Sequence, residues 1–197
     1  MKRRLLPILM TLVLVCALPI WAAFVTSGDV TNPLVCTAGA TLPDLQAKID
    51  AAADNATITL DSDTTITETL VITGKTLTLD LNGYTLRMTG NRSVLCVYNG
   101  ATLTITDSST AKSGTITGGN AEDGDGGGVY VKAYATLEMT GGCITGCRAE
   151  DGGGVYIDNN ATLKMTGGCI TDCHAIYGGG IYSCENLYMG CLLYTSP

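Results

Sequence analysis

The chain has 197 residues, enough for one domain, and a formal net charge of −7 from 11 basic and 18 acidic residues. It holds 25 glycines but only one Trp and one Phe, which excludes a core built mainly from large aromatic side chains. The acidic balance also argues against nucleic acid and anionic membrane surfaces as partners.

Residues 1–23 are predicted to be a signal peptide. Three basic residues at 2–4 precede an apolar run over 5–20, and small residues follow at 22–23. The alternative is an uncleaved anchor, but the run is shorter than the roughly 20 apolar residues of a spanning helix. Cleavage would leave 8 basic and 18 acidic residues, a net charge near −10. The mature chain is therefore expected to be secreted or displayed on a cell surface, meeting a membrane only through this leader or a further anchor.

A linker and then a helix are predicted next. Residues 24–40 are small and polar, as is typical of a linker. Over 41–54, Thr41 can cap a helix, and Pro43 and Asp44 favour its first turn. One apolar stripe of this helix is formed by Leu42, Leu45, Ile49 and Ala52. We expect the helix to cover the open end of the repeats that follow, because repeat arrays need a cap.

The clearest feature is an internal repeat. Residues 126–151 are followed by a near-copy at 152–177, and a third copy begins at 178, so the period is 26 residues. Each copy holds three short runs of strand formers, separated by glycine or small polar residues. Such a unit fits one coil of a parallel β-helix, with stacked coils roughly 4.8 Å apart. The glycine triplets are expected to form corners that need positive φ or close backbone approach.

Stacking the copies predicts ladders of equivalent residues inside the coil, since paired strands place them one above another. Degenerate copies extend the pattern back to about residue 56, so five to six coils fit in 55–190. Asn82-Gly83 and Asn99-Gly100 are predicted turns between strands. The expected ladders are Leu137 over Leu163, Met139 over Met165, Ile144 over Ile170, and Val129 over Val155 over Ile181.

The glycine–aliphatic–tyrosine and TGGxIT motifs of these copies, with Thr76-Leu-Thr-Leu-Asp-Leu-Asn-Gly83, resemble those of a known family. The chain is similar to right-handed parallel β-helix (pectin-lyase-like) bacterial surface proteins, especially adhesin-like ones with polymorphic outer-membrane-protein-like repeats. The resemblance implies an all-β, right-handed parallel β-helix. It leaves the activity open, because the same coil carries enzymes, adhesins and passive stalks.

The end of the chain departs from the repeat. Residues 191–197 have no glycine corner and resemble a translated sequencing-adapter end. The alternative is an unusual natural tail. We expect this segment to be non-native and the natural protein to be longer.

Catalytic residues are not apparent in the strands. A glycosidase needs two carboxylates within several ångströms of each other, which on a β-helix means acidic residues in equivalent places of adjacent coils. Glu138 instead faces Lys164, and no paired carboxylates or lyase motif are found, so an enzyme is not favoured and no cofactor is expected. The strand carboxylates considered are Asp80, Glu138, Asp158 and Asp172.

An acidic corner is the nearest approach to a metal site. Asp123 and Asp125 lie on a glycine-rich turn, and Asp151 follows one coil later. Carboxylates on such turns could bind calcium. The plainer interpretation is a solvated acidic corner.

Four cysteines should stack in two pairs. Cys143 and Cys169 are 26 residues apart, as are Cys147 and Cys173. A separation of about 4.8 Å between coils lies inside the disulfide range, and export would allow oxidation. Stacked free thiols, disulfides and a metal site are the three alternatives.

Four tyrosines follow a Val or Ile in successive copies: Tyr98, Tyr130, Tyr156 and Tyr182. They are expected to form an exposed ladder, which either binds sugars or stabilises itself by stacking. The sequence therefore favours an adhesive or structural protein whose partners are glycans or proteins of host or neighbouring cells. The alternative is the non-catalytic N-terminal part of a polysaccharide lyase or glycoside hydrolase.

Overall fold

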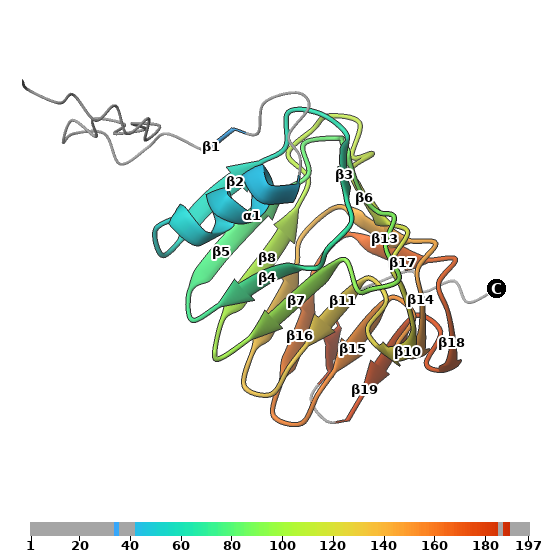
Figure 1. The fold of residues 1–197 in the computed structure, drawn as a ribbon. Coiled ribbons are helices and arrows are strands. Elements are labelled where there is room, and N and C mark those ends of the chain that lie inside the picture. The colour runs from blue at the N-terminus through green and yellow to red at the C-terminus, as the bar shows by residue number, and fades with distance from the viewer. Residues whose placement is uncertain (1–33, 36–41, 185–186, 190–197) are drawn as a thin grey trace, which may run out of the picture. The chain divides into compact units, whose positions relative to one another are not determined.

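The computed structural model describes residues 34–35, 42–184 and 187–189 (Figure 1). The predicted signal peptide at 1–23 and the predicted non-native segment at 191–197 lie outside these residues. So does the predicted linker at 24–40, apart from a two-residue strand at 34–35 that sequence analysis missed. No helix in the described ranges is both long and apolar enough to cross a bilayer.

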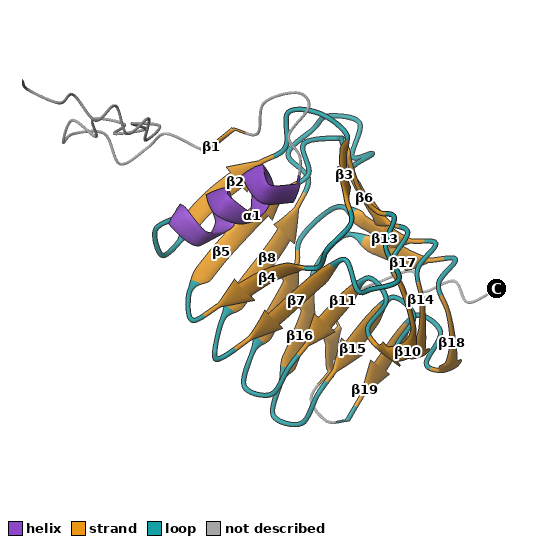
Figure 2. Cartoon of the chain, viewed as in Figure 1, coloured by secondary structure: helices purple, strands orange, loops and turns teal. Residues whose placement is uncertain are grey.

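The described residues form a parallel β-solenoid of about five turns, with strands stacked along its length (Figures 1 and 2). All pairings between its strands are parallel, and each coil contributes one strand to each of several sheets. The prediction of an all-β parallel β-helix with about 26 residues per coil is therefore confirmed.

Four sheets run along the solenoid, and we name them A to D. Sheet A contains, in spatial order, β1 (Leu34–Val35), β2 (Ala56–Thr59), β5 (Thr76–Asp80), β8 (Thr102–Thr106), β12 (Thr136–Met139), β16 (Thr162–Met165) and β20 (Leu187–Met189). Sheet B contains β3 (Thr64–Ile66), β6 (Thr85–Met88), β9 (Thr115–Thr117), β13 (Cys143–Thr145) and β17 (Cys169–Thr171). Sheet C contains β4 (Leu70–Thr73), β7 (Leu95–Tyr98), β11 (Val129–Val131), β15 (Val155–Ile157) and β19 (Ile181–Ser183). Sheet D contains β10 (Asn120–Asp125), β14 (Arg148–Asp151) and β18 (His174–Tyr177).

The core consists of ladders of aliphatic residues that point into the coil. Every predicted ladder is present in register, and its members are buried apart from the half-buried Ile181. The alternation of buried and less buried residues along each strand is the period-two pattern of a sheet with one face on the core. Burial of this continuous apolar stack stabilises the coils, since no single coil can bury its own inner face.

The glycine triplets form corners as predicted. The first glycine of each has positive φ, at +66° for Gly126, +64° for Gly152 and +62° for Gly178. The second approaches the next coil closely, because a Cβ on Gly127 would lie 2.5 Å from the carbonyl oxygen of Gly153. The two Asn-Gly turns at 82–83 and 99–100 also have positive φ at both residues, as a tight turn requires.

Helix α1 (Leu42–Ala51) lies against the first coil (Figure 2). Leu45, Ile49 and Ala52 of the predicted stripe are buried in the core. Gln46 takes the place of a neighbouring strand, since its side chain accepts from Val71 N at 2.9 Å and donates to Val71 O at 3.1 Å. The helix thus covers the open apolar end and satisfies part of the free edge of β4.

The end of the helix is held by a lysine from the next coil. Lys75 Nζ donates to the carbonyl oxygens of Ile49, Asp50 and Ala52 at 2.9–3.0 Å. These carbonyl groups lie at the helix C-terminus, where a cation is favourable. The contact fixes the helix to β5, which begins at the residue after Lys75.

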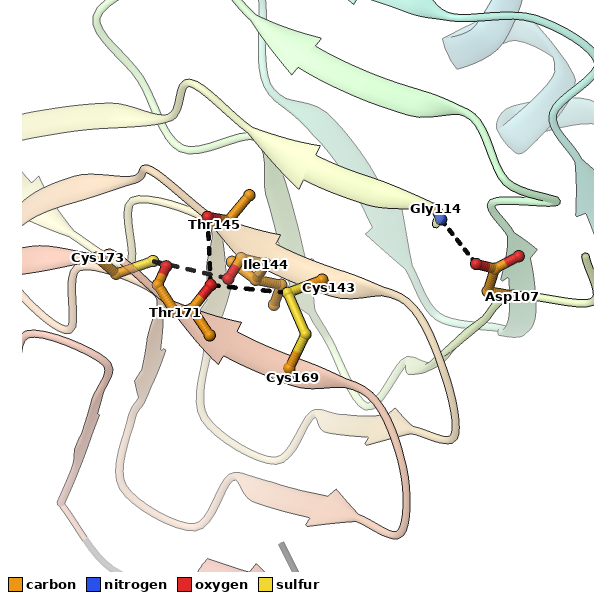
Figure 3. Close-up of a disulfide and its surroundings, with 8 residues drawn as sticks. All are labelled: Asp107, Gly114, Cys143, Ile144, Thr145, Cys169, Thr171 and Cys173. Carbon is orange, nitrogen blue, oxygen red and sulfur yellow. Dashed lines mark hydrogen bonds between the residues drawn. A yellow bond between two sulfur atoms is a disulfide. The ribbon is translucent and has the colours of Figure 1, made fainter. Parts of the chain in front are cut away.

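A buried aspartate organises the excursion at 107–113, which leaves the regular coil outline. Asp107 Oδ1 accepts from the amides of Gly83 at 2.9 Å and Ser109 at 3.0 Å, and Oδ2 accepts from the Gly114 amide at 2.7 Å (Figure 3). Burial acts to raise the pKa of Asp107, but the hydrogen bonds from Ser109, Gly114 and Gly83 outweigh it and hold the pKa below its ordinary value. The carboxylate therefore replaces the missing strand pairing of this loop.

Candidate functional site

A β-bulge on β10 changes the regular surface of the solenoid. Ala121 pairs with Ala149 and Asp125 with Asp151, so four steps along β10 span two steps along β14. The extra residues interrupt the regular pairing and bend the strand, and such irregularities are common beside binding sites. The bulge also brings Asp125 and Asp151 opposite each other on adjacent coils.

The bulge borders an open groove of about 380 Å³ between β10, the loop at 91–93 and sheet C. This volume falls within the range of small-ligand sites, roughly 300–1,000 Å³. Its wall carries carboxylate, amide, hydroxyl and guanidinium groups and one aromatic ring. The side chains that matter here are those of Thr69, Asn91, Arg92, Asn120, Glu122, Asp125 and Tyr130.

The backbone beside the groove is firmly held. Asn120 N donates to Arg92 O at 3.0 Å, and Ser93 Oγ donates to Asp125 O at 3.1 Å. Thr69 Oγ1 donates to Ser93 O at 2.7 Å. The loop at 91–93 is therefore tied both to the bulge and to the preceding coil, so the polar side chains stand on a fixed frame.

Negative charge dominates the electrostatics of the groove. Burial, followed by the charges of Asp151 and Glu150, raises the pKa of Asp125, although a hydrogen bond from Tyr130 acts in the opposite direction. Burial and the charges of Asp125 and Asp158 raise the pKa of Tyr130 to about 12. The Tyr130 hydroxyl is therefore a hydrogen-bond donor at neutral pH. Arg92 supplies positive charge, and its Nε lies 3.2 Å from Glu68 Oε2.

Tyr130, Tyr156 and Tyr182 form the predicted ladder on sheet C, in register on adjacent coils. The rings of Tyr130 and Tyr156 meet edge to face with centroids 5.1 Å apart, and those of Tyr156 and Tyr182 stack with centroids 5.4 Å apart. Each of the three side chains is half-buried. The rings therefore contact one another, and Tyr130 also lines the groove.

The prediction that Tyr98 belongs to this ladder is wrong. Tyr130 pairs with Cys96, and Tyr98 lies two residues further along β7. The reason is the turn at Asn99-Gly100, which matches the turn at 159–160 and so aligns Val97 with the ladder position of Ile157. Tyr98 instead lies beside Lys132, whose Nζ is 6.0 Å from its ring centroid and 5.2 Å from that of Tyr130.

The acidic corner contains the three weak calcium candidates. Asp125 and Asp151 are brought together by register, and Asp123 lies in the bulge between Ala121 and Asp125. Across the described ranges, no group of three or more His, Cys, Asp or Glu side chains is arranged to hold a metal ion. The calcium assignment stays an untested prediction.

The expectation of no paired carboxylates is wrong, because Asp125 and Asp151 pair across β10 and β14. The four carboxylates considered from sequence have other positions. Asp80 is buried and accepts from the amides of Asn82 and Ser108, and Glu138 lies 3.4 Å from Lys164 Nζ. The other two, Asp158 and Asp172, lie at corners outside the strands.

The cysteines stack as predicted, and the two pairs differ. Cys143 and Cys169 are joined by a disulfide with their Cα atoms 4.5 Å apart (Figure 3). Cys147 and Cys173 are free thiols, both buried. Of the alternatives left open by the sequence, the disulfide therefore holds for one pair and free thiols for the other.

Sequence analysis missed the groove residues Asn91, Arg92 and Asn120. One signal was available for Asn120: Leu103 pairs with Leu137 across 34 residues, whereas Leu137 pairs with Leu163 across 26. The surplus lies in the excursion at 107–113 and in the bulge. Insertions into a regular coil alter its surface where loops commonly carry binding residues.

The comparisons add no relative to this description. No family model, curated protein or solved structure matches the chain.

Proposed function

We propose that this chain is a secreted or surface-displayed β-solenoid that binds glycans in the groove beside β10. The observation that carries the proposal is the groove itself, whose lining combines amides, carboxylates and Arg92 with the ring of Tyr130. Sugar hydroxyls both donate and accept hydrogen bonds, and carboxylate, amide and guanidinium groups match them. The predicted leader and the resemblance to pectin-lyase-like surface proteins support display outside the cell.

The shape of the groove favours a chain-like ligand. It is open rather than enclosed, and the tyrosine ladder continues from Tyr130 along sheet C to Tyr156 and Tyr182. Half-buried tyrosines offer apolar ring area together with a hydroxyl group. A glycan held in the groove by several residues can therefore extend along the solenoid and contact further coils.

Replacing Arg92 with alanine is expected to weaken glycan binding about tenfold or more, equivalent to about 1.4 kcal/mol. The guanidinium is exposed and lines the groove, so its loss removes hydrogen-bond donors without opening the core. A glycan array should first identify the ligand, and titration calorimetry should then compare the wild type with Arg92→Ala.

Lys164→Ala is the matched control. Lys164 forms an exposed ion pair with Glu138 at 3.4 Å, similar to that of Arg92 with Glu68, but on sheet A. This variant should bind as the wild type does. Equal weakening in both variants, or no bound glycan on the array, would contradict the proposal.

A second candidate function is hydrolysis of a glycan in the same groove. The observation that favours it is the pairing of Asp125 with Asp151 on adjacent coils, because glycosidases use two neighbouring carboxyl groups. Burial and the charge of Asp151 also raise the pKa of Asp125 above its ordinary value, the direction that suits a general acid. The wild type should then release reducing ends, and Asp125→Asn should slow this at least tenfold, whereas Asp63→Asn on sheet B's side should not. Absence of products from the wild type would reject hydrolysis and leave the binding proposal standing.

A further inference from the structure

Two buried thiols lie one coil apart beside the existing disulfide. The disulfide partners Cys143 and Cys169 face each other across β13 and β17, and Cys147 and Cys173 follow them at the next corner. The register continues through this corner, because His174 N donates to Cys147 O at 2.9 Å. Cys147 is fully buried, and Cys173 is 5% exposed.

The four cysteines occur as a set. In the preceding coil Thr115 replaces Cys143, and Gly119 takes the place of Cys147. The fold therefore does not require sulfur at either position. The two coils that have cysteine have it at both positions, as Cys143 and Cys147 in one coil and as Cys169 and Cys173 in the next.

The two free thiols are neighbours on adjacent coils, since Cys147 and Cys173 occupy the same position of successive repeats. The interaction between the two thiols raises the pKa of Cys147 and lowers that of Cys173. Cys173 Sγ also lies 3.2 Å from Thr171 O and 3.9 Å from Ile144 O (Figure 3). Cys173 is the less buried of the two, so it is the sulfur that an oxidant reaches first.

We propose that Cys147 and Cys173 are an oxidation site that forms a second disulfide between these coils. The oxidant is a small-molecule disulfide such as oxidised glutathione. The first disulfide holds the coils together, and the in-register corner places Cys147 and Cys173 one above the other on adjacent coils, the spacing at which the first pair is already joined.

The exchange proceeds in two steps. The Cys173 thiolate attacks one sulfur of oxidised glutathione, forming a mixed disulfide and releasing one glutathione thiolate. That thiolate accepts the proton of Cys147, and Cys147 Sγ then attacks Cys173 Sγ. The bond between Cys173 and the second glutathione breaks, and this glutathione leaves as a thiolate. It takes a proton from water, which balances the proton that Cys173 lost to water at the start. The protein dithiol is oxidised by two electrons, and oxidised glutathione is reduced to two thiols.

Access to Cys173 comes from the edge of sheet D. Cys173 directly precedes β18, which pairs with β14 on one side and is the edge strand of this sheet in the described residues. Ile176 and Tyr177 on that strand are 71% and 61% exposed. Among the described residues β18 is paired on one side only, so lifting it there requires less free energy than opening a central strand.

Differential alkylation of the wild-type protein tests the proposal. The protein is incubated with oxidised glutathione, denatured and treated with N-ethylmaleimide, then reduced and treated with iodoacetamide. Tryptic peptide 133–148 contains Cys143 and Cys147, so fragmentation can assign each label. We expect maleimide on Cys147 to fall at least tenfold after oxidation, with iodoacetamide appearing at both Cys147 and Cys173.

Variants establish which sulfur atoms are joined. In Cys143→Ser/Cys169→Ser, any oxidised link between peptides 133–148 and 165–197 must use Cys147. The link should persist when Cys184→Ser is added and disappear when Cys173→Ser is added. If wild-type Cys147 and Cys173 still react fully with maleimide after oxidation, or if the link survives Cys173→Ser, the proposal is wrong.

Discussion

Replacing Asp107 with alanine is expected to lower the free energy of unfolding by about 3 kcal/mol. The carboxylate accepts hydrogen bonds from three backbone amides, at Gly83, Ser109 and Gly114, and it is buried. Removing it leaves these donors without their acceptor, and each buried unpaired group costs about 1–3 kcal/mol. Urea unfolding at pH 7, followed by circular dichroism, measures the difference.

The pH dependence provides a second measurement on the same variant. The pKa of Asp107 is lowered in the folded state, so its contribution is fully present above the unfolded pKa of about 3.9 and is lost as pH falls through the folded pKa. The stability gap between wild type and Asp107→Ala should be constant from pH 5 to 7 and narrow below pH 4. Asp63→Ala is the control, because that exposed carboxylate accepts from one amide, Thr85 N at 2.8 Å. Equal losses in the two variants would show that the three-amide network contributes little.

Gly128→Ala should also destabilise the solenoid by about 3 kcal/mol or more. A Cβ on Gly128 would lie 2.5 Å from Gly154 O and 2.5 Å from Ile144 Cγ2. The backbone cannot move away freely, since Gly128 N donates to Gly153 O and its carbonyl accepts from Leu95 N. Overpacking of this kind costs about 1–3 kcal/mol, and more where the obstacle is backbone.

Gly100→Ala separates crowding from backbone strain. Gly100 has a φ of +71°, but a Cβ there would meet nothing within 4 Å. Its substitution should therefore cost only about 1–2 kcal/mol, the penalty of the left-handed conformation. Parallel urea titrations of the two variants test this comparison. A Gly100→Ala loss as large as that of Gly128→Ala would rule out crowding as the cause.

The regular coils could be predicted from sequence because one register satisfies every residue at once. Placing Gly152 over Gly126 also places Leu163 over Leu137, so the aliphatic ladders and the corners support the same alignment. Tyr98 was misplaced because a local match, an aliphatic residue before tyrosine, was preferred to the turn that fixes the register. A match at a single dipeptide is not supported by any other aligned residue, whereas the correct register is supported by the turn and by the ladder together.

The groove and the Asp107 network could not be predicted in the same way. Both depend on segments that depart from the repeat. Such segments have no equivalent in a neighbouring copy, so comparing the copies does not predict which residues lie side by side. A polar excursion such as 107–113 usually remains solvated, so burial of its first carboxylate is set by contacts with the loops around it. For Cys147 and Cys173, the repeat fixes proximity but not oxidation state, which depends on redox conditions.

The equivalence of segments 126–151 and 152–177 has a consequence for the history of the gene. Each segment pairs with its neighbours through the same positions, so Val129 meets Leu95 as Val155 meets Val129. Unequal crossing-over that removes or duplicates 26 codons therefore leaves all the ladders and corners in register. Recombination can lengthen or shorten this solenoid in whole coils. Each added coil brings one more tyrosine to the ladder on sheet C and two more cysteines to the stacks of cysteine.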